Sequence, residues 1–349
     1  MCLQEREEFA VGMPDYGNIM HDALELFTER MLKEHFTWKT IPDEKRRKLS
    51  DECILLAGEA YGGGMLKETH RDSYLLTRMQ HMMDCTTWAL SSQMQQSSFE
   101  TTGYELSFYR LGALAATELS LEDEHRLSLS GRIDRLDTCE DDSHVFVKII
   151  DYKTGDKSFE VTDLYHGLQM QLIVYLDAAM ELTAKEHPDK EIIPGGVYYY
   201  KLKDPIPEMP ADMQIDNKDI TKVYQKEILS ILRPDGLTNM DSPVIPLIDD
   251  SFASDTDDLQ PSTKSLAAHL ETKKDGTLKS SSQTATTETL LTYIKDTRAQ
   301  MTEMGNSILK GDTAIYPYRE KNKSGCDYCS YRGICRFDTK VPGYSYHEL

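Results

Sequence analysis

Two acidic residues that lie in consecutive predicted strands constrain the fold of this chain more than any other feature. The segment GRIDRLD at 131–137 carries Asp134, and VFVKIIDYKTGD at 145–156 carries Asp151 and Lys153. Alternate residues of a strand face the same side, so Asp151 and Lys153 should point into one site. Asp134 can meet them if the two strands pair antiparallel. The pattern therefore predicts a sheet that gathers two carboxylates and a lysine.

Two carboxylates beside a lysine suit one kind of chemistry. Carboxylate oxygens bind hard divalent cations such as Mg²⁺. Such an ion polarises a phosphoryl oxygen and lowers the pKa of a bound water. A neighbouring lysine can position that water or stabilise charge in the transition state. The set is typical of phosphodiester hydrolysis, although Asp-x-Lys alone also occurs in ordinary surface turns.

Three further side chains fit the same kind of site. His21 lies on a helix expected over 15–34, and Gln171 and Tyr175 lie on a helix expected over 167–184. Gln171 and Tyr175 are four residues apart and so share one helical face. They can hydrogen-bond a scissile phosphate or a splayed nucleotide. Each also has an ordinary interpretation as a core or surface residue.

The remaining periodicity predicts alternating helices and strands. Residues 233–285 differ, because they are rich in Ser, Thr and Asp and hold few large apolar side chains. That composition predicts a polar, acidic insert or linker that is partly disordered. We therefore expect three parts: a core at 1–232, the insert at 233–285, and a C-terminal helix with a cysteine cluster at 286–349. Helices are expected over 70–96 and 287–309, and strands over 102–111, 125–136, 145–152 and 195–202.

The order of the motifs resembles the RecB-like branch of the PD-(D/E)XK nucleases: His, then Gly-x-x-Asp, then Asp-Tyr-Lys-Thr-Gly, then Gln-x-x-x-Tyr. The resemblance implies a restriction-endonuclease-like α/β core, with a mixed β-sheet flanked by helices. It also implies an active, metal-dependent deoxyribonuclease that uses Mg²⁺, with Mn²⁺ as the alternative. The implied metal ligands are His21, Asp134 and Asp151, and the implied catalytic set is Asp134, Asp151, Lys153, Gln171 and Tyr175.

Three of the seven cysteines cluster near the end of the chain, as Cys326-x2-Cys329-x5-Cys335. An odd total with this clustering favours metal ligation over disulfides. Thiolates at such density bind zinc or an iron–sulfur cluster. Zinc ribbons usually carry two separated CxxC pairs, and only one is present. Three cysteines leave one ligand missing for either metal.

The tail resembles that of AddB-type subunits of bacterial helicase–nucleases, as do the segments at 3–24, 273–279 (KKDGTLK) and 315–319 (IYPYR). This resemblance covers nearly the whole chain and implies a [4Fe-4S] cluster. The fourth ligand is then either Cys2 or a cysteine upstream of a truncated chain. It further implies a C-terminal nuclease domain that pairs with an AddA-type subunit at double-strand breaks. Such a domain would act in recombinational repair as an exonuclease on the 5′-ended strand.

The net charge of −20 opposes a DNA binder that works by bulk charge. The charge is uneven, since 203–258 holds five basic against thirteen acidic residues and 310–340 holds seven against four. A local basic strip can still meet a phosphate backbone. The N-terminus has no signal-peptide pattern, no apolar run could span a membrane, and no GxxxxGK[ST] loop occurs. We expect a soluble, intracellular protein that is not a motor by itself, and the resemblance to AddB-type subunits implies the bacterial cytoplasm.

Two other interpretations remain open. One is a free-standing RecB-like iron–sulfur exonuclease of the CRISPR-adaptation type, which the chain length and the 233–285 segment disfavour. The other is a DNA-end-binding module with an idle nuclease, which the complete set of two acids and a lysine disfavours. Removing one carboxylate separates the enzymes from the binder.

Overall fold

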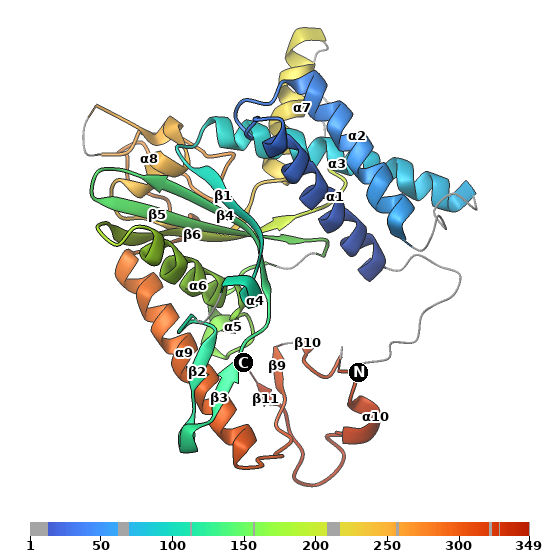
Figure 1. The fold of residues 1–349 in the computed structure, drawn as a ribbon, viewed down its shortest axis with the longest axis vertical. Coiled ribbons are helices and arrows are strands. Elements are labelled where there is room, and N and C mark those ends of the chain that lie inside the picture. Colours follow the sequence, from blue (N-terminus) through green and yellow to red (C-terminus); the bar gives the residue numbers. More distant parts are fainter. Residues whose placement is uncertain are drawn as a thin grey trace.

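A six-stranded mixed sheet forms the centre of the computed structural model, in the order β1-β4-β5-β6-β7-β8 (Figure 1). β4 pairs antiparallel with β1 and β5, whereas β5 and β6 run parallel. The structure describes residues 13–61, 70–111, 114–155, 158–207, 217–255, 258–320, 323–327 and 329–348. The strands are β1 (Glu100–Ser107), β4 (Arg132–Glu140), β5 (His144–Lys153), β6 (Glu191–Lys201), β7 (Asp235–Asn239) and β8 (Thr284–Ala285).

Helices cover both faces of this sheet, which confirms the predicted fold class (Figure 1). Successive residues of β5 alternate between two cores: Phe146 and Ile150 face one, and Val147 and Ile149 face the other. The first core takes residues from α1 (Met13–Lys33), α2 (Asp43–Ala60), α3 (His70–Gln95), α7 (Asn217–Ile231) and α8 (Val244–Ile248). The second takes residues from α4 (Phe108–Leu111), α5 (Val161–Tyr165), α6 (Gln171–Glu186) and α9 (Thr287–Leu309).

Most predicted elements are confirmed within a few residues, with three differences. The strand expected over 102–111 ends at Ser107 and continues as α4, and the strand expected over 125–136 is split into β3 and β4. The helix expected from 167 begins at Gln171, after the short helix α5. Helix α2 was not predicted. Its segment DEKRRKLSDECILLAGEA is strongly charged, and its apolar face becomes evident only against α1 and α3.

The prediction of a partly disordered insert or linker at 233–285 is wrong for the described part of this segment. It contributes β7 and β8 to the central sheet, and it buries Phe252 and Leu270 completely or nearly so. Its polar side chains are satisfied locally, as where Asp249 accepts hydrogen bonds from Ser251 and Ser265. Low apolar content therefore did not indicate disorder, because side-chain hydrogen bonds stabilise these turns in place of a large core.

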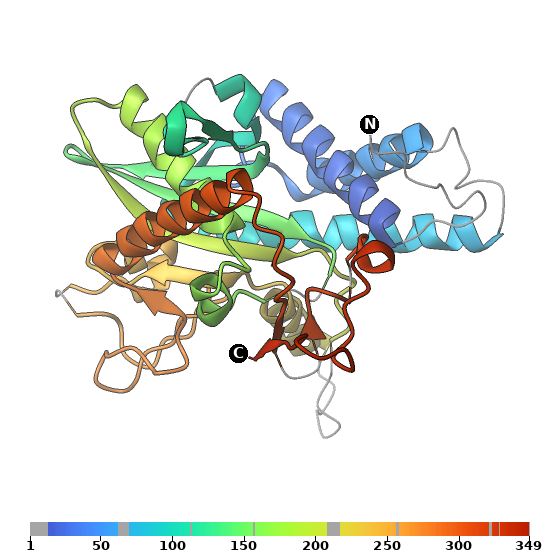
Figure 2. The same ribbon diagram turned by 90° about the horizontal axis from the view of Figure 1, so that it is seen from below.

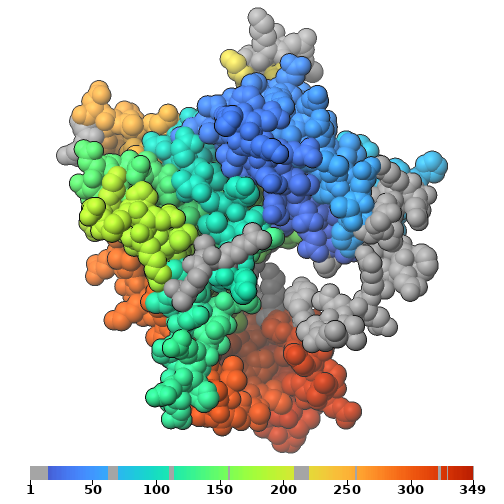
Figure 3. All heavy atoms as spheres, viewed as in Figure 1, coloured from blue at the N-terminus to red at the C-terminus, as the bar shows by residue number. Residues whose placement is uncertain are grey.

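The C-terminal segment forms a lobe beneath the N-terminal helices in the space-filling view (Figure 3, red). It holds the three-stranded sheet β10-β9-β11, which lies near α5 in the second view (Figure 2). Its elements are β9 (Tyr318–Glu320), β10 (Lys323–Ser324), α10 (Arg332–Cys335) and β11 (His347–Glu348). The ribbon β2 (Glu118–Ser120) and β3 (Arg126–Ser128) lies against α9; two 3₁₀ turns, η3 (Glu122–Glu124) and η4 (Asp250–Phe252), complete the elements. None of the described helices has the length and apolar character needed to cross a bilayer.

Candidate active site

The two predicted acidic residues lie at the ends of β4 and β5, which pair antiparallel as expected. The backbone N–H of Tyr152 donates to Asp134 Oδ2 over 2.8 Å, so Asp134 is fixed directly against β5. Lys153 Nζ lies 2.6 Å from Asp151 Oδ2. The prediction that Asp151 and Lys153 share one side of the strand is therefore confirmed, and both carboxylates are buried.

Gln171, at the first turn of α6, connects these groups. Its Nε2 donates to Asp151 Oδ1 over 3.1 Å, and its Oε1 accepts from Lys153 Nζ over 3.2 Å. The same Nε2 lies 2.9 Å from the hydroxyl of Tyr175, one helical turn further on. The helical face predicted for Gln171 and Tyr175 is thus turned toward the carboxylates. Because both ends of the Gln171 amide are engaged, its orientation is determined by the site.

Helix α1 brings His21 close to the carboxylate of Asp134. His21 Nδ1 lies 3.7 Å from Asp134 Oδ2. One turn earlier, Gly17 faces Thr154, and a Cβ at position 17 would lie only 2.9 Å from Thr154 Oγ1. A side chain there would push α1 away from the end of β5. Gly17 therefore permits the close approach that places His21 beside the carboxylate.

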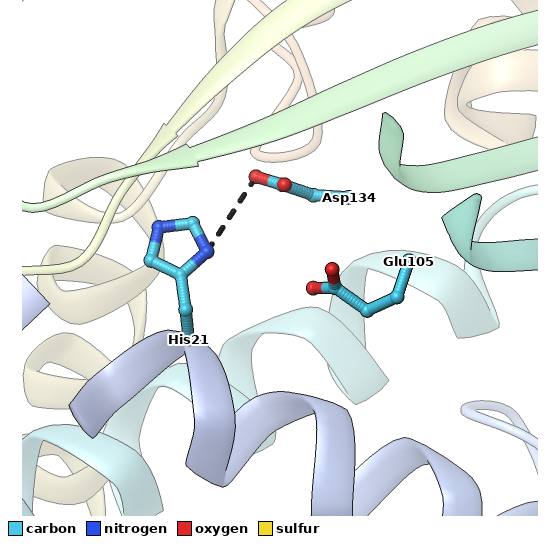
Figure 4. Close-up of side chains that lie close together, drawn as sticks. All are labelled: His21, Glu105 and Asp134. Carbon is cyan, nitrogen blue, oxygen red and sulfur yellow. Dashed lines mark ion pairs between the residues drawn. The ribbon is translucent and has the colours of Figure 1, made fainter. Parts of the chain in front are cut away.

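Glu105 is a site residue that the sequence analysis missed. Its carboxylate and those atoms of His21 and Asp134 that could bind a metal lie within 4.8 Å of one another, the one such group of three in the described residues (Figure 4). The β1–β4 register pairs Tyr104 with Arg135 and Leu106 with Ile133, which places Glu105 opposite Asp134. A sequence signal did exist, since a carboxylate amid the apolar residues of a strand calls for a partner.

The electrostatics of the site favour binding of a cation. Burial raises the pKa of Asp134 to about 6; burial and the charge of Asp134 raise the pKa of Asp151 to about 6. Burial, with Asp134 again adding to it, raises the pKa of Glu105 to about 8. Burial lowers the pKa of His21, which favours the neutral imidazole that binds metals. Carboxylate oxygens with one imidazole nitrogen are a donor set that fits Mg²⁺ or Mn²⁺.

These pKa values predict how Mg²⁺ should stabilise the protein. A carboxyl whose folded pKa is raised holds its proton longer than in the unfolded chain, so without metal the free energy of unfolding should fall as pH rises from about 4 to about 6. Mg²⁺ needs the deprotonated carboxylates, so its stabilising effect should grow over the same range. We expect a larger Mg²⁺-induced rise in Tm at about pH 7.5 than at about pH 5. Equal rises, or the same rise in an Asp134→Asn/Asp151→Asn double variant, would contradict this site.

Cys326 lies in a turn, Cys329 follows it, and Cys335 is the last residue of α10. Among the described residues, the sulfur atoms of these three cysteines do not come together as a group that could hold a metal ion. Cys329 N contacts Cys326 O at 3.4 Å, and the N–H of Cys335 donates to Tyr331 O over 2.9 Å at the start of α10. Cys326 and Cys335 are half-buried and Cys329 is exposed, and all three are free thiols. Thiolates of this kind are the side chains that ligate iron–sulfur clusters in proteins. Cys2, the predicted alternative for the fourth, lies outside the described residues.

A mixed sheet covered by helices, with two acids and a lysine at adjoining strand ends, defines a class of metal-dependent nucleases. The model of the PD-(D/E)XK nuclease superfamily matches residues 1–336, and the chain belongs to this superfamily.

Individual curated proteins are also similar to this chain. The chain is similar to one subunit of the ATP-dependent helicase/deoxyribonuclease of Lachnoclostridium phytofermentans, with 41% identity over 100% of this chain and 28% of the relative. The subunits of the same name from Alkaliphilus oremlandii and Clostridium acetobutylicum are 32% and 33% identical over 99% of this chain, which covers 28% and 29% of them. The chain therefore spans less than a third of the length of these relatives.

Proposed function

We propose that this chain is the metal-dependent deoxyribonuclease domain of a helicase–nuclease. The observation that carries the proposal is the hydrogen-bonded site in which Asp134, Asp151, Lys153 and Gln171 meet. The similar proteins named as deoxyribonuclease subunits support DNA as the substrate. The test is cleavage of end-labelled single-stranded DNA that requires Mg²⁺ and stops on addition of EDTA.

In this proposal, His21, Asp134 and Asp151 would hold a divalent ion, and Glu105, whose carboxylate lies in one group with the possible ligand atoms of His21 and Asp134, would offer a further ligand. When bound there, such an ion would supply positive charge to polarise the scissile phosphate. Lys153 presents its ammonium group where negative charge develops and can orient the attacking water. Gln171 keeps Lys153 and Asp151 in their relative positions and also donates to the hydroxyl of Tyr175, a group that can hydrogen-bond a phosphate.

The biological setting of the proposal comes from the relatives. Their name joins an ATP-dependent helicase to a deoxyribonuclease. We propose that this chain carries out the exonuclease step of recombinational break repair in the bacterial cytoplasm, beside an AddA-type partner. The proposed substrate is the 5′-ended strand. Labelling each strand of a duplex in turn, in the reconstituted complex, tests that polarity.

The proposal includes a [4Fe-4S] cluster on Cys326, Cys329 and Cys335. Cys329→Ser should remove the brown colour and most of the iron from protein purified without oxygen, and should lower Tm, because ligation is coupled to folding. Cys139→Ser is the matched control, since this half-buried thiol lies in β4. Unchanged colour and Tm in Cys329→Ser would contradict a structural cluster at this place.

A further inference from the structure

Arg132 is the first residue of β4 and lies two positions before Asp134. Alternate residues of a strand face the same side, so the side chains of Arg132 and Asp134 point the same way. On the neighbouring strand β5, Asp151 and Lys153 have the same spacing. Each of the two strands therefore carries one carboxylate and one cation: Arg132 accompanies Asp134 as Lys153 accompanies Asp151.

The guanidinium of Arg132 reaches the possible metal ligands through Glu105. Its Nε forms an ion pair with Glu105 Oε2, and the Glu105 side chain is only 9% exposed. The carboxylate of Glu105 lies in one group with the ligand atoms of His21 and Asp134 (Figure 4). Burial raises the pKa of Asp134, whereas the charges of Lys153 and Arg132 lower it. The guanidinium is thus separated from the proposed ion site by a single carboxylate.

The ion pairs of Arg132 leave part of its side chain open to solvent. The side chain is 45% exposed, and its second partner is the exposed Glu25, with 3.8 Å between Arg132 Nη1 and Glu25 Oε2. An ion pair between two exposed groups contributes little to stability. A guanidinium has five N–H donors in a planar fork that matches the oxygens of a phosphate. Donors therefore remain for a phosphate that approaches from solvent.

The start of β4 is packed closely, which fixes the point from which Arg132 extends. The N–H of Phe108 donates to the carbonyl oxygen of Gly131 over 3.0 Å. A Cβ at Gly131 would lie 3.3 Å from the ring of Phe108 and 3.5 Å from that of Tyr175. The residue before Arg132 therefore lies between α4 and α6, and the guanidinium starts from a rigid element, as a group that orients a substrate requires.

We propose that Arg132 binds a phosphate group of the DNA strand at the active site and so positions that strand for cleavage. This inference rests on the proposed nuclease function. Arg132 and Lys153 would then contact the phosphates from two neighbouring strands of the sheet. Neutralisation of the buried Glu105 carboxylate is the competing role for the same guanidinium. The salt dependence of cleavage separates the two roles, because a contact with phosphate releases counterions from DNA and a contact with Glu105 does not.

The test compares Arg132→Gln, Arg132→Met and Arg132→Lys with the unchanged chain. The kcat/KM for end-labelled single-stranded DNA is measured with Mg²⁺ over a range of NaCl concentrations. The two uncharged variants should lose roughly tenfold or more in kcat/KM, the effect of one hydrogen bond to a charged group. Their plots of log kcat/KM against log salt should be shallower by about 0.7, the value for one phosphate contact on a single strand. Arg132→Lys keeps the charge and should keep the slope.

Two uncharged variants are used so that a folding defect in one of them, seen as a lower Tm, leaves the other to decide. Arg126→Gln is the matched control, since Arg126 is 73% exposed in β3 and its ion-pair partner is Glu118 of β2. This control should keep both the rate and the slope of the unchanged chain.

A methylphosphonate linkage, which removes the charge of a single phosphate, gives a second measurement. It is placed at successive positions of the oligonucleotide. The unchanged chain should be slowed at the position that Arg132 contacts, and Arg132→Gln should be slowed less at that position than the unchanged chain. At the other positions the two proteins should be slowed equally.

The inference is overturned if the uncharged variants keep the salt slope of the unchanged chain, or if each methylphosphonate slows both proteins equally. A lower rate with an unchanged slope would show that Arg132 only neutralises Glu105. In these cases the unchanged chain still cleaves DNA, so the nuclease proposal stands. Absence of Mg²⁺-dependent cleavage by the unchanged chain would instead overturn the nuclease proposal, and this inference with it.

Discussion

Asp151→Asn should reduce DNA cleavage by at least about 10³-fold, which corresponds to about 4 kcal/mol of lost transition-state stabilisation. Asp151 accepts a hydrogen bond from Gln171, forms an ion pair with Lys153 and lies near Asp134, so its charge serves both the proposed metal and the lysine. The amide has nearly the same shape, and the fold should persist. Binding of single-stranded DNA should persist or tighten, because a negative charge near phosphate is removed.

Asp142→Asn is the matched control for this experiment. Asp142 is exposed in the hairpin that joins β4 to β5, at the far end of the same two strands. The Asp142→Asn variant should cleave end-labelled DNA in the presence of Mg²⁺ at the same rate as the unchanged chain. Full activity in Asp151→Asn would show that the site is assigned wrongly. An unchanged chain that binds DNA but never cleaves it would favour the idle-nuclease alternative.

Asp137→Asn should lower the free energy of unfolding by about 3–5 kcal/mol. The side chain of Asp137 does not itself contact the carboxylates of the active site. Asp137 is fully buried and receives hydrogen bonds from Arg135 and Thr101, with Lys148 Nζ 3.0 Å away. Burial opposes its charge, but the two cations hold its pKa well below the usual range. Loss of the carboxylate leaves two buried cations uncompensated. Urea denaturation followed by circular dichroism gives the measurement.

Lys148→Met tests whether that loss is electrostatic. In the unchanged chain this substitution removes one partner of Asp137 and should be destabilising. In the Asp137→Asn background it removes an uncompensated cation and should cost less, which a double-mutant cycle quantifies. Additive effects, or a loss below about 1 kcal/mol in Asp137→Asn, would contradict the buried network.

Much of the candidate site was predictable because its geometry is local. The spacing of Asp151 and Lys153 places them on one side of any strand, and that of Gln171 and Tyr175 places them on one face of any helix. The roles of these residues came from the resemblance in motif order and remain proposals. Glu105 was not predicted as a site residue, because it precedes Asp134 by 29 residues and meets it only through the β1–β4 register.

The sequence by itself determined the local pattern: buried strands, amphipathic helices, and pairs of polar groups that share one side of a strand or one face of a helix. These follow from the repeat of two residues in a strand and 3.6 in a helix, which any chain must obey. Only the tertiary structure decided that 233–285 joins the central sheet and that Glu105 faces Asp134. Such contacts depend on which distant segments pair, and no local repeat encodes that choice.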